Sequence, residues 1–167
     1  LEDRPEKTSK AENYLLVGSD TREGLTKEQM RELRVGSTAT AAGGRSDTML
    51  LIHLSKARDR AYIISLPRDS LVTIPEHVSS IDKKTIVSAR PGKLNSAFSY
   101  GGAPLLIETI ELATSIKIDH YVEVSFAGFA GIVDALGGIE VCTKVDIDDP
   151  KSHLVLSAGV HTLDGIE

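Results

Sequence analysis

The chain has 167 residues and a formal net charge of −5, with 41% hydrophobic and 26% charged residues. That length fits one domain, and the composition is typical of a globular protein with a substantial core. The sequence contains no basic tract and no interleaving of basic and aromatic residues, which excludes nucleic acid as its main partner. It also contains no Gly-x-Ser-x-Gly motif, P-loop or dinucleotide-binding fingerprint, which removes three common classes of enzyme.

The first half of the chain predicts a linker followed by a small set of strands. Residues 1–12 are polar and aperiodic, so a tail or linker is expected there. A short apolar run at 14–17 predicts a strand that ends in a glycine turn. Residues 26–33 have a capping-box pattern and predict a helix. Two apolar runs, at 48–54 and 61–66, predict a hairpin joined by a charged turn.

The second half predicts alternating helices and strands. Residues 103–115 predict a helix with a proline in its first turn, and 126–136 predict a second helix ended by two glycines. Strands are expected at 121–124 and 139–142. The segment 161–165 predicts a turn leading to a helix that lies beyond the end of this sequence.

These elements together predict one α/β domain over residues 13–167. The expected architecture has three layers, with a mixed central sheet and helices on both faces. Near-continuous apolar runs in the strands indicate that both faces of the sheet are covered.

Charged residues gather in the turns that flank three of the predicted strands. Taken singly, each is an ordinary turn residue or half of an exposed ion pair. Because the ends of neighbouring strands lie side by side, these turns are expected to converge. Two carboxylates at such an edge can hold one hard cation, and arginine forks can hold phosphate oxygens. The residues are Asp20, Arg22, Arg45, Asp47, Arg68 and Asp69.

A fourth segment adds polar groups of the same kind. Lys93 and Asn95 precede the aromatic residues Phe98 and Tyr100 and a pair of glycines. A lysine and an amide could bind the same anion as the arginines. The alternative is that Asn95 simply caps the helix that follows.

The predicted helices also raise the question of a lipid slot. Four of their apolar residues either form a packed core or line a slot for a lipid chain between helix and sheet, and composition does not distinguish the two. A slot for a lipid-linked substrate should open beside Arg68 and Asp47. The four residues are Ile107, Ile110, Phe126 and Phe129.

Five segments carry a family resemblance that covers the chain from about residue 13 to its end. Together and in this order, they resemble the LytR-CpsA-Psr family of cell-wall enzymes. The long loop after the first segment is similar to that of actinobacterial members. The segments read LVGSDTR at 16–22, GRSDTMLLI at 44–52, SLPRD at 65–69, KLNSAFSYGG at 93–102 and GGIEV at 137–141.

The resemblance implies a membrane-anchored, extracytoplasmic transferase whose anchor lies in a segment absent from this chain. Such enzymes move a glycopolymer from a polyprenyl-pyrophosphate carrier onto peptidoglycan and form a phosphodiester. They use magnesium at the pyrophosphate and hold the prenyl chain in an apolar tunnel.

The resemblance also implies roles for individual residues. Asp20 and Asp47 correspond to the carboxylates on the metal side. Arg45 and Arg68 correspond to arginines that hold the pyrophosphate and assist catalysis. Apart from the resemblance, the position of Asp69 directly after Arg68 makes it either a catalytic base or the residue that orients Arg68. Substrate contacts are further expected from Arg22, Lys93 and Asn95.

One departure from the family concerns the end of the chain. The family has an arginine-rich segment just downstream of the turn at 163–165, whereas this sequence stops at Glu167. The C-terminal part of the catalytic domain is therefore expected to be missing. Two alternatives stay open: a regulatory module that binds polyprenyl phosphate without catalysis, and a metal-dependent pyrophosphatase.

Overall fold

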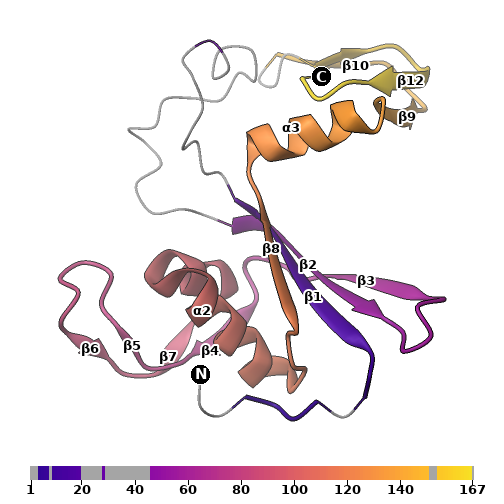
Figure 1. Cartoon of the computed structure of the whole chain (residues 1–167). Helices are drawn as coiled ribbons and strands as arrows, with labels where there is room; N and C mark the ends of the chain where they lie inside the picture. The colour runs from indigo at the N-terminus through magenta and orange to yellow at the C-terminus, as the bar shows by residue number, and fades with distance from the viewer. Residues whose placement is uncertain (1–3, 8, 20–27, 29–45, 151–153, 167) are drawn as a thin grey trace. The chain divides into compact units, whose positions relative to one another are not determined.

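The computed structural model describes residues 4–7, 9–19, 28, 46–150 and 154–166 (Figure 1). The chain divides into two compact units, Leu1–Thr21 with Ser37–Ser125, and Arg22–Gly36 with Phe126–Glu167. The fold is mixed α/β with a central mixed sheet, as the sequence predicts. The predicted helix at 26–33 lies outside the described residues except for Glu28, which is helical.

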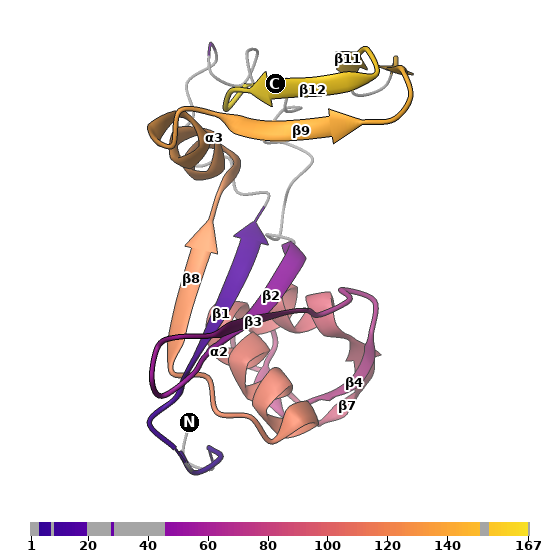
Figure 2. The same ribbon diagram turned by 90° about the vertical axis from the view of Figure 1, so that its right-hand side faces the viewer.

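The central sheet belongs to the first unit and has the strand order β3-β2-β1-β8. Strand β1 (Glu12–Ser19) pairs antiparallel with β2 (Ser46–Leu54), which pairs antiparallel with β3 (Ala61–Ser65). On its other side β1 pairs in parallel with β8 (His120–Val124), as Figure 2 shows. The two predicted strands at 48–54 and 61–66 therefore form the expected hairpin.

One face of this sheet packs against helix α2 (Leu94–Thr114). Alternate residues of β1 and β2 point to that face, because side chains along a strand alternate in direction. Leu15, Val17, Met49 and Leu51 are at most 2% exposed there. They meet apolar side chains of the helix and of the strands before it, chiefly Ile74, Leu94, Leu105, Leu106 and Ile110.

Helix α2 consists of two segments that meet at Gly102. This glycine has φ 64° and ψ −156°, a conformation that interrupts the helix and that residues with a Cβ rarely adopt. Pro104 lies in the first turn of the second segment, which corresponds to the predicted helix at 103–115. The first segment, from Leu94, is not predicted, because its serine, asparagine and glycine residues are weak helix formers.

Between β3 and α2 the chain forms a two-stranded arm that the sequence analysis does not predict. Strand β4 (Leu71–Ile74) pairs with β7 (Arg90–Lys93). Farther out, β5 (His77–Val78) pairs with β6 (Ile86–Val87). Strands of two to four residues are too short to show a clear alternation of apolar and polar residues.

The second unit contains helix α3 (Phe126–Ala135) and two small sheets. Strand β9 (Ile139–Thr143) pairs with β12 (Gly159–Leu163), and β10 (Ile147–Asp149) pairs with β11 (Leu154–Leu156). The predicted second helix and the predicted strand at 139–142 are confirmed. The predicted turn at 161–165 is wrong over its first three residues, which extend β12 because their neighbours on β9 supply ladder hydrogen bonds.

The described part of the N-terminal segment, expected to be a linker, is tied to the first unit. Two nitrogens of Arg4 donate hydrogen bonds to the carboxylate of Glu111, Nε to Oε2 at 3.0 Å and Nη2 to Oε1 at 2.6 Å. Nη2 also donates to the carbonyl of Ile118. Glu111 is 3% exposed. Lys7 binds Asp119 at 2.8 Å. The described residues of this segment therefore do not form a free tail.

Candidate active site

The end of β1 and the start of β2 lie at the same edge of the central sheet. Gly18 pairs with Thr48 and Ser19 pairs with Ser46, so Asp47 has no register partner on β1. This irregularity is a β-bulge, a feature that re-aims side chains and is often found beside active sites. Asp47 thus lies on a bulge at the sheet edge.

The expected metal residues lie largely outside what the structure describes. Asp20 follows Ser19 directly in the sequence but is outside the described residues, as are Arg22 and Arg45. The side chain of Asp47 is also outside them. Among the described residues, no group of three or more His, Cys, Asp or Glu side chains could hold a metal ion. The magnesium site stays a prediction.

Ser46 is a buried polar residue at the same edge. Its side chain is fully buried, and its hydroxyl has no hydrogen-bond partner among the described residues. Buried polar atoms in native proteins are nearly always paired. The edge beside the bulge therefore presents a polar group that can take a partner from outside the described part of the chain.

The turn after β3 delivers Arg68 and Asp69 to this end of the sheet. The amide of Leu66 donates to the carbonyl of Met49 at 2.9 Å, which continues the pairing beyond β3. The amide of Ser70 then donates to the carbonyl of Pro67 at 3.0 Å and closes a tight turn. Because Met49 is two residues after the bulge at Asp47 on β2, this turn begins close to the bulge.

Three charged side chains meet at the turn. Lys93 Nζ donates to Asp69 Oδ1 at 2.7 Å, and Arg68 Nε lies 3.7 Å from Asp69 Oδ2. The hydrogen bond and the charge of Lys93, followed by the charge of Arg68, hold the pKa of Asp69 below its usual value. The three side chains are about half exposed, so an anion can reach them. Asp69 is an ionised carboxylate that positions two cations.

Asn95 joins this cluster through its backbone. Its amide donates to the carbonyl of Arg68 at 3.0 Å, and the amide of Leu94 donates to the carbonyl of Ser70 at 2.9 Å. The residue that precedes the helix is Lys93, which makes no side-chain capping hydrogen bond. The alternative in which Asn95 caps the helix is therefore wrong. The structure brings the side chains of Arg68, Asp69 and Lys93 together, with the backbone of Asn95 beside them.

Sequence reasoning missed an aromatic and cationic contact beside this cluster. The ring of His77 stacks on that of Tyr100 at 5.5 Å, and the guanidinium of Arg90 lies 5.5 Å from the centre of the Tyr100 ring. Tyr100 belongs to the segment 93–102 that carries the resemblance. Its two partners come from the unpredicted arm, so only the composition of that arm could have indicated them.

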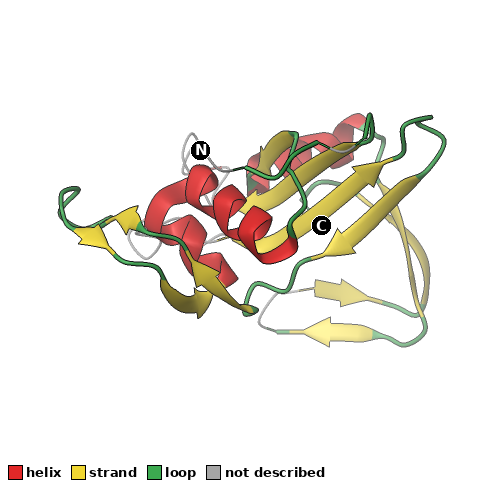
Figure 3. Ribbon diagram, turned by 90° about the horizontal axis from the view of Figure 1, so that it is seen from below, coloured by secondary structure: helices red, strands yellow, loops and turns green. Residues whose placement is uncertain are grey.

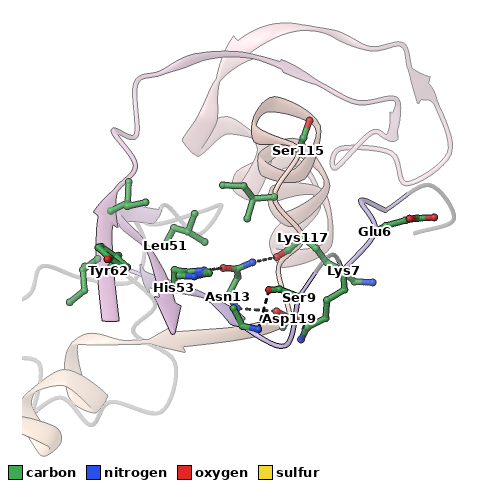
Figure 4. Close-up of a pocket in the computed structure, with 14 residues that line it drawn as sticks. Glu6, Lys7, Ser9, Asn13, Leu51, His53, Tyr62, Ser115, Lys117 and Asp119 are labelled. Carbon is green, nitrogen blue, oxygen red and sulfur yellow. Dashed lines mark hydrogen bonds and ion pairs between the residues drawn. The ribbon is translucent and has the colours of Figure 1, made fainter. Parts of the chain in front are cut away.

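A cavity of about 510 Å³ lies at the opposite end of β1 (Figure 4). Leu51, Ile64 and Ile116 form its apolar wall. Its polar side includes Asn13, whose side-chain oxygen lies 2.7 Å from His53 Nδ1 and whose amide nitrogen donates to the carbonyl of Lys117. The cavity is lined by the N-terminal segment, by strands β1 to β3 and by the segment that follows helix α2.

Among the described residues of the first unit, the expected lipid slot does not appear at Ile107 and Ile110. Ile110 is 1% exposed, and Ile107 packs against the same core, so both belong to packed structure. Phe126 and Phe129 lie in the second unit. The described lining of the cavity does not include Arg68. A mouth beside Arg68 is therefore not confirmed.

The described part of the chain contains no helix that is long and apolar enough to span a bilayer.

Comparisons with known proteins identify relatives along nearly the whole chain. A "Probable cell wall biosynthesis protein LcpB" of Corynebacterium glutamicum is 39% identical over 92% of this chain and 33% of its own length. The polyisoprenyl-teichoic acid–peptidoglycan teichoic acid transferase TagT of Bacillus subtilis is 35% identical over 93% of this chain and 42% of its own length. The chain thus spans less than half of these relatives.

A solved structure of a related protein is also similar in fold to this chain. The LytR-CPS2A-psr family protein YwtF (TagT) with bound octaprenyl pyrophosphate lipid matches 97% of this chain and 59% of that chain, with a TM-score of 0.68 and 27% identity. The model of the LytR_cpsA_psr family matches residues 2–167. The chain therefore belongs to the LytR-CpsA-Psr family.

Proposed function

We propose that this domain transfers a glycopolymer from a polyprenyl-pyrophosphate carrier onto peptidoglycan and forms a phosphodiester link. The cluster of Arg68, Asp69 and Lys93 beside the bulge at Asp47 carries the proposal. The names of the relatives support it, since one is a teichoic acid transferase and a TagT structure holds a polyprenyl pyrophosphate lipid. The acceptor lies in the cell wall, so the proposal includes an extracytoplasmic location at the cell membrane.

The reaction is an exchange at one phosphorus atom. A hydroxyl oxygen of the acceptor bonds to the phosphorus that carries the glycopolymer. The bond from this phosphorus to the bridging oxygen breaks, polyprenyl phosphate leaves, and the hydroxyl proton is released. Negative charge builds on the phosphorus oxygens, where pre-aimed donors are most effective.

Arg68 is the described residue best suited to stabilise that charge, because a guanidinium can donate two parallel hydrogen bonds to a phosphate. Lys93 adds a second positive charge. We assign Asp69 a positioning role, since its lowered pKa makes it a weak proton acceptor. Arg45 would hold the same pyrophosphate, with further substrate contacts from Arg22 and Asn95.

Asp20 and Asp47 would hold Mg²⁺, which would neutralise part of the pyrophosphate charge. The donor set fits, since a hard cation prefers carboxylate oxygens and retains waters. The bulge at Asp47 and the end of β1 at the residue before Asp20 support a shared location at one sheet edge.

The cavity of Figure 4 is the proposed resting place for the far part of the prenyl chain. Three residues at alternate positions lead from the cavity to the charged turn. Ile64 lines the cavity, Leu66 is partly buried against the core, and Arg68 follows in the turn after β3. Residues two apart on a strand share one face. A prenyl chain could follow this row from the arginine to the cavity.

Two observations keep other functions in contention. Lys93 and Arg68 are held by the exposed carboxylate of Asp69, and such a cluster could also bind polyprenyl phosphate without catalysis, as in a regulatory module. Arg68 is 49% exposed, so water could compete with a wall hydroxyl, as in a pyrophosphatase.

One assay separates the three functions. The protein is incubated with a polyprenyl-pyrophosphate-linked glycan labelled in its sugar and with wall fragments, with and without Mg²⁺. Label joined to the wall fragments through a phosphodiester supports transfer. Soluble phosphorylated glycan alone would favour a pyrophosphatase, and binding without cleavage would favour the regulatory module.

The proposed lipid path has its own test. Ile64→Asp should weaken binding of the carrier, while Leu112→Asp, at an exposed position of helix α2 away from the cavity, should not. Cleavage of a short soluble pyrophosphate should change little in either variant. Equal carrier binding by both variants would contradict the path.

A further inference from the structure

The hairpin formed by β5 and β6 exposes an apolar outer face and an apolar tip. Val78 and Ile86 lie directly opposite each other in the register, so their side chains project from the same face. They are 52% and 65% exposed. Ile81, at the tip, is 94% exposed. Figure 3 shows this hairpin projecting beyond helix α2.

The other face of the hairpin is fixed to the first unit. His77 and Val87 form the second register pair, and the ring of His77 stacks on that of Tyr100. The guanidinium of Arg90, at the start of the returning strand β7, covers the same ring. The domain therefore holds the inner face of the hairpin and leaves the outer face open.

The tip is a closed, hydrogen-bonded turn. The amide of Ser79 donates to the carbonyl of Thr85 at 2.8 Å. The carboxylate of Asp82 accepts hydrogen bonds from the amides of Lys84 and Thr85 and from the Thr85 hydroxyl. These bonds hold the pKa of Asp82 well below its usual value. Ile81 is therefore presented by a preorganised turn.

Two lysines flank the exposed isoleucine. Lys83 and Lys84 are exposed, and neither forms an ion pair with any described residue. The two lysines outnumber the one carboxylate of the turn, Asp82, so the tip is net positive although the whole chain carries a net charge of −5. Aliphatic side chains beside lysines suit an anionic bilayer, whose interface takes the apolar groups and whose headgroups attract the ammonium groups.

We propose that the β5–β6 hairpin is a membrane-contacting finger. Ile81 enters the interface of an anionic bilayer, Val78 and Ile86 follow at its boundary, and Lys83 and Lys84 meet the lipid headgroups. A tip-to-tip contact with a second copy of the chain would also cover Ile81, but it would bring the two pairs of lysines together. The two strands that lead from the body of the domain to the finger, β4 and β7, also carry the candidate site at their base, because Lys93 is the last residue of β7 and lies opposite Leu71 of β4 in the register. The finger would hold the domain near a membrane that carries its lipid-linked substrate, and this purpose rests on the proposed function. The contact with the bilayer does not depend on it.

The absence of tryptophan from the sequence makes the contact directly measurable. Ile81→Trp places a single reporter at the tip, and Leu112→Trp places one at an exposed site on helix α2 as the matched control. Each protein is mixed with phosphatidylcholine vesicles with or without phosphatidylglycerol, and none of the vesicles contains carrier lipid. The tip reporter should shift to the blue and be quenched by brominated lipid in the anionic vesicles only. The control reporter should show neither change.

Charge and apolarity are then tested separately by co-sedimentation with the same vesicles. Lys83→Gln with Lys84→Gln should weaken binding about 10- to 30-fold, since each cation near the surface is worth about one kcal/mol. The control removes two other exposed lysines by Lys10→Gln with Lys56→Gln and should bind as the parent does. Ile81→Ser should weaken binding without reducing the melting temperature, because its side chain lies in solvent.

Other outcomes would overturn the finger. They are an unshifted tip reporter, equal shifts at both reporter sites, or equal losses for both lysine pairs. A tip shift without vesicles that grows with protein concentration, and a doubled mass by ultracentrifugation, would assign the hairpin to contacts between copies. Because the vesicles lack carrier lipid, failure of the proposed transfer reaction would leave these results unchanged.

Discussion

Lys93 and Asp69 join two segments that are 24 positions apart in the sequence, with Lys93 Nζ 2.7 Å from Asp69 Oδ1. Lys93 immediately precedes helix α2, and Asp69 lies in the turn after β3. This ion pair couples the start of the helix to the turn that carries Arg68. Changes at either residue should therefore alter the aim of the arginine as well as the local charge.

Replacement of Arg68 should remove most of the proposed activity. Arg68→Ala should lower turnover of the lipid-linked substrate about 100-fold, because one pre-aimed donor to developing charge is worth about 3 kcal/mol. Arg68→Lys should recover little of it, since an ammonium lacks the two-point fork. Arg58→Ala, at an exposed ion pair with Glu12, serves as the control. Turnover near the parent value in Arg68→Ala would reduce the residue to a surface ion pair.

The pH profile separates the two roles considered for Asp69. The pKa of Asp69 is lower in the folded protein than in the unfolded chain. Its ion pairs with Lys93 and Arg68 are therefore complete above the usual carboxyl pKa, and they are lost as the pH falls through the lowered pKa of Asp69. If Asp69 only positions the two cations, Asp69→Asn should lower kcat about 3- to 10-fold and leave the shape of the pH profile of kcat/KM unchanged. Loss of more than about 100-fold, together with disappearance of the acid limb, would identify a base instead.

Asp20 and Asp47 should contribute jointly to divalent-cation binding. Asp20→Asn and Asp47→Asn should each weaken Mn²⁺ binding about 10-fold or more, because each removes one charged oxygen ligand. Asp148→Asn, at an exposed position of β10, is the control and should have no effect. Calorimetric titration with Mn²⁺ gives the affinities. Equal affinity in all three variants would contradict the metal site.

Removal of Arg4 should destabilise the first unit. Arg4→Ala leaves the carboxylate of Glu111, 3% exposed, without its cation. We expect a loss of about 2 to 3 kcal/mol in the free energy of unfolding. Lys7→Ala breaks the more exposed pair with Asp119 and should cost about 0.5 kcal/mol. Denaturant titrations compare the two; similar losses would mean that Glu111 is satisfied without Arg4.

Two glycine substitutions should have opposite effects. Gly102→Ala places a Cβ at φ 64° and should destabilise by about 1 to 2 kcal/mol. Gly131 lies within helix α3, and a Cβ added there would meet no described atom within 4 Å apart from its chain neighbours and the backbone of its own helix, so Gly131→Ala should stabilise by about 0.5 to 1 kcal/mol. Thermal unfolding measures both. A stabilising Gly102→Ala would mean that the break in helix α2 is not held by the glycine.

The sequence predicts the elements that have strong local patterns. The strands at 48–54 and 61–66 and the helix at 126–136 are long enough for their apolar residues to show a period. The arm before Lys93 lacks such a pattern, because its strands are held by cross-strand pairs such as Val72 with Gly92. The anchoring of Arg4 depends on Glu111, which is distant in the sequence, and no local signal announces that contact.

The sequence predicts the candidate site from the types of charged residue that occupy the turns beside the strands, and it does not predict which of these side chains contact one another. Of the turns expected to converge, the structure describes the one with Arg68 and Asp69, which meets Lys93, while Asp20, Arg22 and Arg45 lie outside the described residues. The direct bond between Lys93 and Asp69 was not foreseen, since composition does not tell which cation a carboxylate chooses.

The central position of β1 has a consequence for the order in which the sheet assembles. Asn13 and Asp119, which meet where β1 joins β8, are 106 positions apart, while β2 follows β1 far more closely. Synthesis proceeds at about 5 to 20 residues per second. When the chain is delivered from its N-terminus at a comparable rate, the β1–β2–β3 meander can form several seconds before β8 is available. During that interval β1 has an unpaired edge, which is a template for wrong pairing with another chain. Chaperone binding to the unfolded chain should consequently peak before residue 120 is available and decline once β8 has paired with β1.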